Sequence, residues 1–183
     1  MIGRSESLPA MIDAARYSAI ETLRDGRRVE IRALRPEDRS ALAAAVDRAS
    51  TQSLYRRFFA VKRFFTERET DFFVNVDFVD HVVLVAVVDE DGQAAIVGSS
   101  RYVLVQPGKA EVAFAVIDAY QGQGVGSALM RHLAAISREA GLQQLVADVL
   151  PENIPMLRLF QKCGCRMNTR REAEVVRVTL GLN

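Results

Sequence analysis

Residues 111–150 read EVAFAVIDAYQGQGVGSALMRHLAAISREAGLQQLVADVL. The apolar run at 112–117 is rich in β-branched and aromatic residues, which is typical of a short strand covered on both faces. Apolar residues then recur at 125, 129, 133, 136 and 140, along one face of a helix, and Gly141 supplies a stop. A second apolar run follows, so the predicted order is strand, glycine turn, helix, strand.

Glycines 122, 124 and 126 occupy the predicted turn between the strand and the helix. Because glycine lacks a Cβ atom, backbone N–H groups can close around a ligand there, and the helix dipole adds positive potential. The turn is therefore predicted to hold a phosphate group. A dinucleotide fingerprint would need glycine where Ser127 stands, and a P-loop would need a Gly-Lys-Ser/Thr sequence that the chain lacks.

The turn sequence at 121–126, QGQGVG, fits the pattern Gln/Arg-x-x-Gly-x-Gly. It resembles the acyl-CoA pyrophosphate loop of the GNAT superfamily of N-acetyltransferases. Residues 153–165, NIPMLRLFQKCGC, resemble the second signature of that superfamily, an asparagine that opens a helix ending in Tyr-Glu-Lys-Leu-Gly-Phe. Asn153, Lys162 and Gly164 match in register, whereas Phe160, Cys163 and Cys165 replace a tyrosine, a leucine and an aromatic residue. By these two motifs, the chain is identified as a member of the superfamily.

The resemblance implies an α+β fold, an α/β/α sandwich with a mixed, splayed sheet of six or seven strands flanked by about four helices. It also implies acetyl-CoA as the co-substrate and no metal. The residues expected to bind acetyl-CoA are Phe114, Ala115, Val116, Gln121, Gly122, Gln123, Gly124, Val125, Gly126, Ser127, Asn153 and Phe160.

A narrower resemblance covers residues 21–165. The sequences LRDG (23–26), IRALRPED (31–38), SLYRRFF (53–59) and AEVAF (110–114) are similar to the acetyltransferase domain of bacterial protein-lysine acetyltransferases. That group acetylates the active-site lysine of acyl-CoA synthetases, so the resemblance implies a protein lysine as the amine acceptor. Two alternatives stay open: a small-molecule amine as acceptor, or a degenerate domain that binds acyl-CoA without catalysis, which the phenylalanine at 160 suggests.

Glu111 is the candidate general base. An acceptor lysine has a pKa of about 10.4 and must lose its proton before it attacks the acetyl group. Glu111 opens the central predicted strand, and apolar neighbours can raise a carboxyl pKa toward neutrality. Phe160 cannot donate a proton to the departing thiolate, but a thiol pKa of about 8.5 makes the thiolate a tolerable leaving group.

The length and composition of the chain limit its domain number, its partners and its location. A length of 183 residues, 49% of them apolar, suits one domain. The net charge of +1 gives no field that would attract nucleic acid or a membrane surface. No apolar run is long enough for a membrane span, so we expect the protein to be cytoplasmic. We also expect it to be a monomer or a homodimer. Cys163 and Cys165 are interpreted as small buried hydrophobes because both histidines lie far away in sequence.

The other segments are predicted by their local patterns. Residues 1–20 are expected to form an arm that precedes an acetyltransferase domain at 21–183. Expected strands form a hairpin at 21–34 and lie at 82–88, 94–105 with a bulge at Gly98, 165–169 and 174–180. Helices are expected from about residue 37 and over 66–75. Aromatic and basic residues alternate over 53–65, which suits nucleic-acid stacking or, as we favour, a one-sided helix that lines the acceptor groove.

Overall fold

The computed structural model describes residues 12–60 and 65–182. In these residues, eight strands form one sheet in the order β1-β2-β3-β4-β5-β6-β8-β7. The strands are β1 (Ser18–Thr22), β2 (Arg28–Ala33), β3 (His81–Glu90), β4 (Gln93–Gln106), β5 (Lys109–Val116), β6 (Gln144–Val149), β7 (Arg166–Glu172) and β8 (Val175–Gly181). The α-helices are α1 (Arg39–Arg48), α2 (Thr51–Phe58), α3 (Glu67–Val74), α4 (Val125–Glu139) and α5 (Ile154–Gln161).

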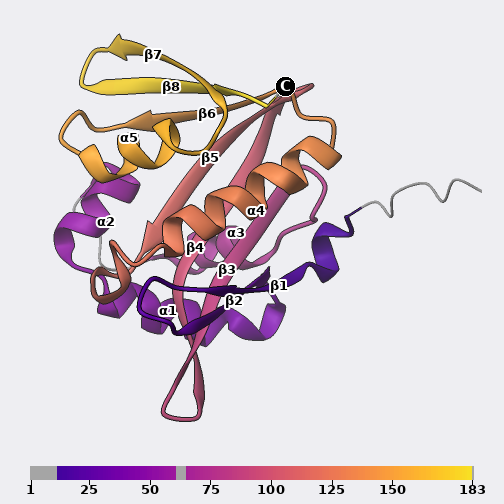
Figure 1. Ribbon diagram of the computed structural model, residues 1–183, viewed down its shortest axis with the longest axis vertical. Helices are drawn as coiled ribbons and strands as arrows, with labels where there is room; N and C mark the ends of the chain where they lie inside the picture. Colours follow the sequence, from indigo (N-terminus) through magenta and orange to yellow (C-terminus); the bar gives the residue numbers. More distant parts are fainter. Residues whose placement is uncertain (1–11, 61–64, 183) are drawn as a thin grey trace, which may run out of the picture.

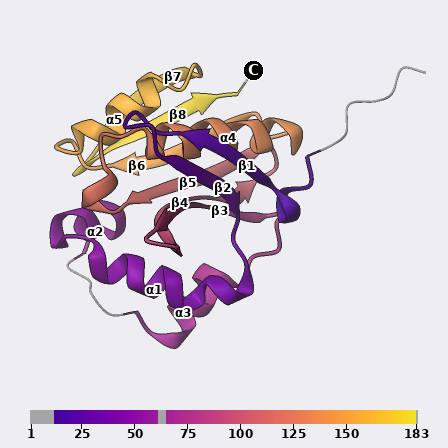
Figure 2. The same ribbon diagram turned by 60° about the horizontal axis from the view of Figure 1, so that its bottom comes forward.

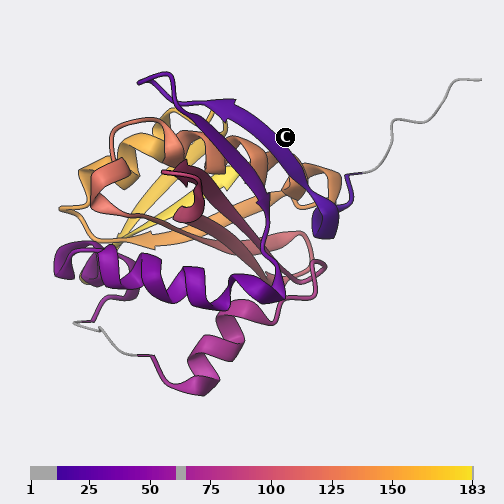
Figure 3. The same cartoon turned by 90° about the horizontal axis from the view of Figure 1, so that it is seen from below.

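Helices cover both faces of the sheet (Figures 1 and 2). Helix α4 crosses one face, and α1, α2 and α3 form a layer on the other, which Figure 3 shows from below. Strand β3 is buried from His81 to Val88 because its successive side chains enter the two opposite layers. Leu84 belongs to the core cluster beneath α4, whereas Val83 and Val85 belong to the cluster beneath α1. The predicted α/β/α sandwich is confirmed.

The sheet splits between β5 and β6, its parallel pair. These strands pair at Lys109 with Gln144, at Ala110 with Leu145 and at Glu111 with Val146, and no further. Beyond Glu111, β5 continues to Val116 on β4 alone, while β6 follows β8 along its whole length. The backbone groups of β5 that would have faced β6 are therefore left available to a ligand.

The hairpin predicted at 21–34 is confirmed in β1 and β2, but its first strand extends into residues 1–20, which the sequence prediction placed in an arm. The sheet has eight strands where six or seven were predicted. β1 begins at Ser18 and pairs with β2 in the sheet. Its burial pattern contains no fully buried residue, and Ile20 is 54% exposed, so this edge strand carries little of the apolar alternation that identifies strands. Residues 1–11 lie outside the described residues, and the limits of the domain remain a prediction.

Several local predictions are confirmed. Thr66 and Glu69 form a capping box at the start of α3. The register of β3 and β4 shifts between the Ala86–Gly98 pair and the next one, which is the bulge expected at Gly98. Gly141 follows α4 with a φ of +75°, the left-handed conformation of a C-terminal stop.

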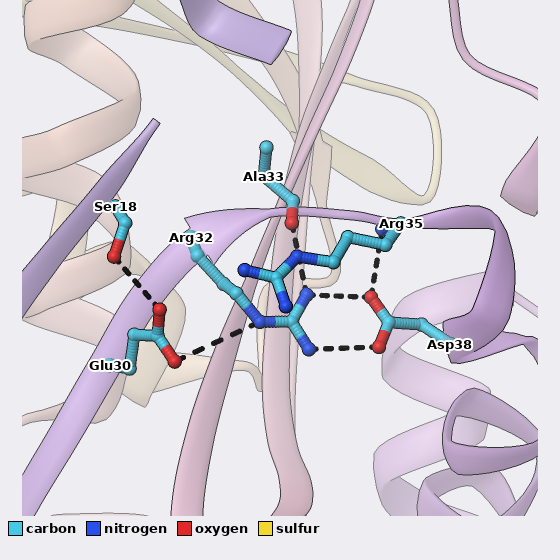
Figure 4. Close-up of polar contacts among 6 residues, drawn as sticks. All are labelled: Ser18, Glu30, Arg32, Ala33, Arg35 and Asp38. Atoms are coloured by element: carbon cyan, nitrogen blue, oxygen red, sulfur yellow. Dashed lines mark hydrogen bonds and ion pairs between the residues drawn. The ribbon is translucent and has the colours of Figure 1, made fainter. Parts of the chain in front are cut away.

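A buried ion pair fixes the start of the α1–α3 layer against the sheet (Figure 4). Arg32 of β2 donates to both carboxylate oxygens of Asp38, at 2.6 and 2.8 Å, and the Arg35 N–H donates to Asp38 at 2.8 Å. Burial alone raises the pKa of Asp38, but the hydrogen bonds from Arg32 and Arg35 outweigh it and hold that pKa below its usual range. The pair therefore joins β2 to the turn that opens α1.

Asp38→Asn is expected to lower the free energy of unfolding by about 2 kcal/mol at neutral pH, because Arg32 loses a charged, doubly bonded partner. The pKa of Asp38 is lower in the folded chain than in the unfolded one. The contribution of the Asp38 carboxylate to the free energy of unfolding is thus complete above a pH of about 4. It is lost as the pH falls through the pKa that Asp38 has in the folded chain. Urea unfolding of both proteins at neutral pH and near pH ~3 checks this. An equal difference at both pH values would contradict the assignment.

Candidate active site

A cavity of about 750 Å³ lies where the sheet splits. Its walls come from the α1–α3 layer, from β4, β5 and β6, from the N-terminus of α4 and from α5. This volume is in the range of small-molecule and cofactor sites. The predicted site residues on its walls are Glu111, Phe114, Ala115, Val116, Gln121, Gly122, Gly124, Gly126, Ser127, Asn153 and Phe160.

Two predicted site residues do not line this cavity. The Val125 side chain is buried in the core beneath α4. The Gln123 side chain accepts a hydrogen bond from Arg27 and donates one to the Ala119 carbonyl instead. The glycine spacing predicted the loop correctly but does not show which side chains between the glycines face the ligand.

The glycine loop leads directly into α4. Gly122 has a φ of +74°, and Gly124, the N-cap residue, has a φ of +105°. Gly124 has no side chain to cap this helix, and Gly126 and Ser127 of its first turn line the cavity, so among the described residues the first N–H groups have no side-chain cap. Arg24 adds a cation, since its guanidinium donates to the Gly122 carbonyl at 3.1 Å and its side chain lines the cavity. Free N–H groups, a helix dipole and a guanidinium together suit a phosphate.

Hydrogen bonds attach this loop to β5 and to α2. The Gln121 Nε2 donates to the Val116 carbonyl and to the Ser53 Oγ, both at 3.0 Å. Asp118 accepts from the Ser50 N–H at 2.8 Å and from the Ser50 hydroxyl at 2.7 Å. These contacts fix the first turn of α2 beside the end of β5. Sequence reasoning missed Asp118 because its partners lie 65 or more positions away in the chain.

Helix α5 closes the far wall. Asn153 is its N-cap residue, and its side-chain oxygen accepts from the Met156 N–H at 3.4 Å, as expected for an asparagine that opens this helix. Phe160 is 1% exposed and packs edge-on against Phe114 with ring centroids 5.9 Å apart. The position that holds a tyrosine in the family signature is therefore an apolar part of this wall.

Glu111 lies at the point where β5 and β6 separate. It is the last residue of β5 that pairs with β6, and its side chain is exposed on the cavity wall. Among the described residues, no hydrogen bond or ion pair involves its carboxylate. The carboxylate is therefore available to accept a proton from a molecule in the cavity.

Two arginines that were not among the predicted site residues also line the cavity, although one of them, Arg57, belongs to the segment 53–65 that was predicted to line the acceptor groove. Arg57 comes from α2 and Arg101 from β4. Burial lowers the pKa of Arg57 to about 10, and burial together with the charge of Arg57 lowers the pKa of Arg101 to about 9. Both stay cationic at neutral pH. A charged residue in the middle of the long strand predicted at 94–105 was the available signal for Arg101.

The two cysteines are free, half-buried thiols. Burial raises the pKa of Cys163 to about 11, and its thiol donates to the Phe160 carbonyl. In the part of the chain that the structure describes, no three His, Cys, Asp or Glu side chains gather as a metal site would require. The helices found there are also too short or too polar to cross a bilayer.

Comparison with known proteins is consistent with this geometry. Residues 48–165 match the model of the acetyltransferase (GNAT) family. Acetyltransferase PA5475 of Pseudomonas aeruginosa is 36% identical over 127 residues, which cover 69% of this chain and 68% of that protein. Acetyltransferase Pat of Mycolicibacterium smegmatis is 35% identical over 63% of this chain, and the match spans 34% of that longer protein.

Solved structures extend the likeness to nearly the whole chain. The GNAT domain of PAT from S. lividans has a TM-score of 0.82 and 34% identity, with 96% of this chain and 99% of that chain covered. The structure of yncA from Salmonella typhimurium with its cofactor acetyl-CoA has a TM-score of 0.68 at 18% identity, with coverages of 85% and 94%. The second likeness concerns the fold alone, and acetyl-CoA is there the cofactor of yncA. The chain belongs to the GNAT family of acetyltransferases and is an acyltransferase.

Proposed function

We propose that this protein transfers the acetyl group of acetyl-CoA to a lysine side chain of another protein, with Glu111 as the general base. The observation that carries the proposal is the carboxylate of Glu111, which makes no hydrogen bond or close ion pair among the described residues and lies where β5 and β6 separate. The family supplies the reaction, and Glu111 supplies the proton acceptor that the reaction needs.

The proposed position of acetyl-CoA follows from the free backbone groups. The pyrophosphate binds the loop at 121–127, where the N-terminus of α4 and Arg24 offer positive potential. The pantetheine arm runs along residues 112–116 in the gap beside β6. Successive N–H groups of a strand point to opposite sides, so those of β5 that do not bond β4 can hold the acetyl oxygen.

The chemical steps balance without a further reactant. Glu111 accepts a proton from the lysine ammonium, directly or through water, and the resulting amine attacks the acetyl carbonyl carbon. The C–N bond forms, and the N–H groups of β5 stabilise the oxyanion. The C–S bond then breaks, and the CoA thiolate takes up the extra proton that the attacking nitrogen still carries, directly or through water, which leaves a neutral amide; Glu111 releases its own proton to solvent. No side chain needs to replace the tyrosine that the chain lacks at Phe160.

Phe160→Tyr is accordingly expected to change kcat by less than tenfold, although acid–base catalysis can supply roughly 100-fold. The position is 1% exposed, and the phenylalanine ring sits against Phe114 rather than beside a polar group. Steady-state thiol release from acetyl-CoA with a saturating acceptor measures the change. An increase of more than tenfold would show that protonation of the thiolate limits the wild-type enzyme.

The protein-lysine acceptor follows from the resemblance of residues 21–165 to the acetyltransferase domain of bacterial protein-lysine acetyltransferases. Helix α2, from the basic and aromatic segment, lines the cavity on the side of Glu111, as expected for a groove wall. Residues 61–64 of that segment lie outside the described residues. The cytoplasmic location and the monomeric or dimeric state remain predictions.

The acceptor is tested by incubating the protein with acetyl-CoA and either a purified acyl-CoA synthetase, a polyamine or a free amino acid. We expect thiol release with the synthetase, and mass spectrometry should place an acetyl group on one of its lysines. Rapid acetylation of a small amine without modification of the synthetase would overturn the lysine acceptor. Acetyl-CoA binding without transfer to any amine would indicate a degenerate domain.

A further inference from the structure

Arg57 and Arg101 face the same part of the cavity as Glu111. In the register of β4 and β5, Arg101 pairs with Ala113 and Val103 pairs with Glu111, so Arg101 and Glu111 project from one face, two positions apart. Val83, which pairs with Arg101, belongs to the cluster beneath α1, so this face carries the α1–α3 layer. Arg57 enters from α2 on the same side.

The surroundings of these arginines supply aromatic rings and a neutral imidazole. The Arg101 guanidinium lies 4.6 Å from the centre of the Phe73 ring, and its Nη1 lies 3.3 Å from the Nε2 of His81. Burial and then the charge of Arg101 lower the pKa of His81 to about 4, so the imidazole is neutral at neutral pH. The Arg57 guanidinium lies 4.7 Å from the centre of the Phe58 ring.

Negative charge is scarce around this pair. No ion pair within 4 Å joins Arg57 or Arg101 to an acid among the described residues, although attraction to Glu111 acts on Arg57. Of the other acids on the cavity wall, Asp148 is already bonded to Arg177, and Asp47 belongs to α1. Arg56 also lines the cavity, and its buried Nε has no hydrogen-bond partner. Buried guanidinium groups in such an environment are stabilised most when they bind an anion that neutralises their charge.

We propose that Arg57 and Arg101 form a subsite for a carboxylate that the amine acceptor carries close to the amine that is acetylated. This inference rests on the proposed function and adds a specificity to it. The two cations also disfavour a second positive charge beside them, so they favour the neutral, reactive form of the acceptor amine once its carboxylate is bound. The carboxylate can belong to an acidic residue next to a target lysine, or to a free amino acid.

Two matched pairs of acceptors distinguish these two sources of the carboxylate. One pair is a lysine peptide with glutamate on both sides of the lysine and the same peptide with glutamine instead. The other pair is a free amino acid and the amine left when its carboxylate is removed. We expect kcat/KM to be roughly 10- to 100-fold higher for the carboxylate-bearing member of at least one pair.

Variants test whether the arginines cause that preference. Arg101→Met and Arg57→Met replace each guanidinium with an apolar chain that suits the aromatic surroundings, and each should reduce the preference to less than threefold. Arg101→Lys keeps the charge and should keep part of the preference. Arg68→Met is the matched control, because Arg68 is exposed on α3 and does not line the cavity. Thermal unfolding verifies that each variant is folded.

Three outcomes would overturn the subsite: equal kcat/KM within both acceptor pairs, an unchanged preference in the folded Arg57 and Arg101 variants, or an acetyl-CoA affinity that falls in these variants. The last result would assign the arginines to the cofactor. If the wild type acetylates the acceptors that lack the carboxylate, the proposed acetyl transfer holds even if the carboxylate subsite does not. If no amine of either pair is acetylated, the proposed function itself fails.

Discussion

Glu111→Gln is expected to leave acetyl-CoA affinity unchanged and to lower kcat by roughly 100-fold or more at neutral pH. Glutamine keeps the shape of the side chain but cannot take a proton from the acceptor ammonium. The side chain is exposed and without a partner among the described residues, so its replacement should not disturb folding. Titration with acetyl-CoA and steady-state thiol release measure the two quantities separately.

The loss of activity should depend on pH. As the pH rises toward the lysine pKa of about 10.4, a growing fraction of the acceptor arrives without its extra proton, so the deficit of the variant should shrink. Glu139→Gln provides the control, because Glu139 is an exposed residue at the end of α4 and does not line the cavity. Wild-type turnover in the Glu111 variant at neutral pH would exclude Glu111 as the base.

Gly124→Val is expected to weaken acetyl-CoA binding by roughly 100-fold, the scale of one or two lost hydrogen bonds to a charged group. Gly124 has a φ of +105°, which a β-branched residue resists, and it precedes the first turn of α4 on the cavity wall. A valine there would both shift the loop and occupy the space through which a phosphate approaches the N–H groups. Isothermal titration calorimetry with acetyl-CoA measures the change.

Gly141→Val separates the two causes of that loss. Gly141 has a φ of +75° at the opposite end of α4, and a Cβ atom there would meet no heavy atom within 4 Å. This control therefore carries similar backbone strain without access to the cavity, and we expect it to lose stability but not acetyl-CoA affinity. A folded Gly124→Val variant with wild-type affinity would show that the loop does not hold the pyrophosphate.

The fold was predictable where a local pattern identifies it. The glycine loop, the N-cap at Asn153 and the long β3 and β4 strands each follow from neighbouring residues, and the structure confirms them. The hairpin of β1 and β2 was predicted, but the extension of β1 back to Ser18 was not, because β1 lies at the edge of the sheet with Ile20 exposed. Its position depends on pairing with β2 rather than on its own apolar pattern.

The cavity was predictable only in part. The motifs identified the residues of β5, the loop and α5 because these elements follow one another along the chain. Arg57 and Arg101 lie 44 positions apart, and only the packing of α2 against β5 and the pairing of β4 with β5 place them beside Glu111. Asp118 likewise reaches Ser50 only after the chain folds. Residues that serve a site through such distant contacts leave no spacing to recognise.

The position of acetyl-CoA in the gap between β5 and β6 is the central claim, and amide hydrogen exchange with and without acetyl-CoA tests it most directly. We predict slower exchange in residues 112–116, where the N–H groups that do not bond β4 face the proposed pantetheine, and in residues 122–127, which surround the proposed pyrophosphate. The β7–β8 hairpin, at the far edge of the sheet, should exchange at an unchanged rate. Slower exchange confined to regions outside the cavity, or no change at a saturating concentration of acetyl-CoA, would contradict the account.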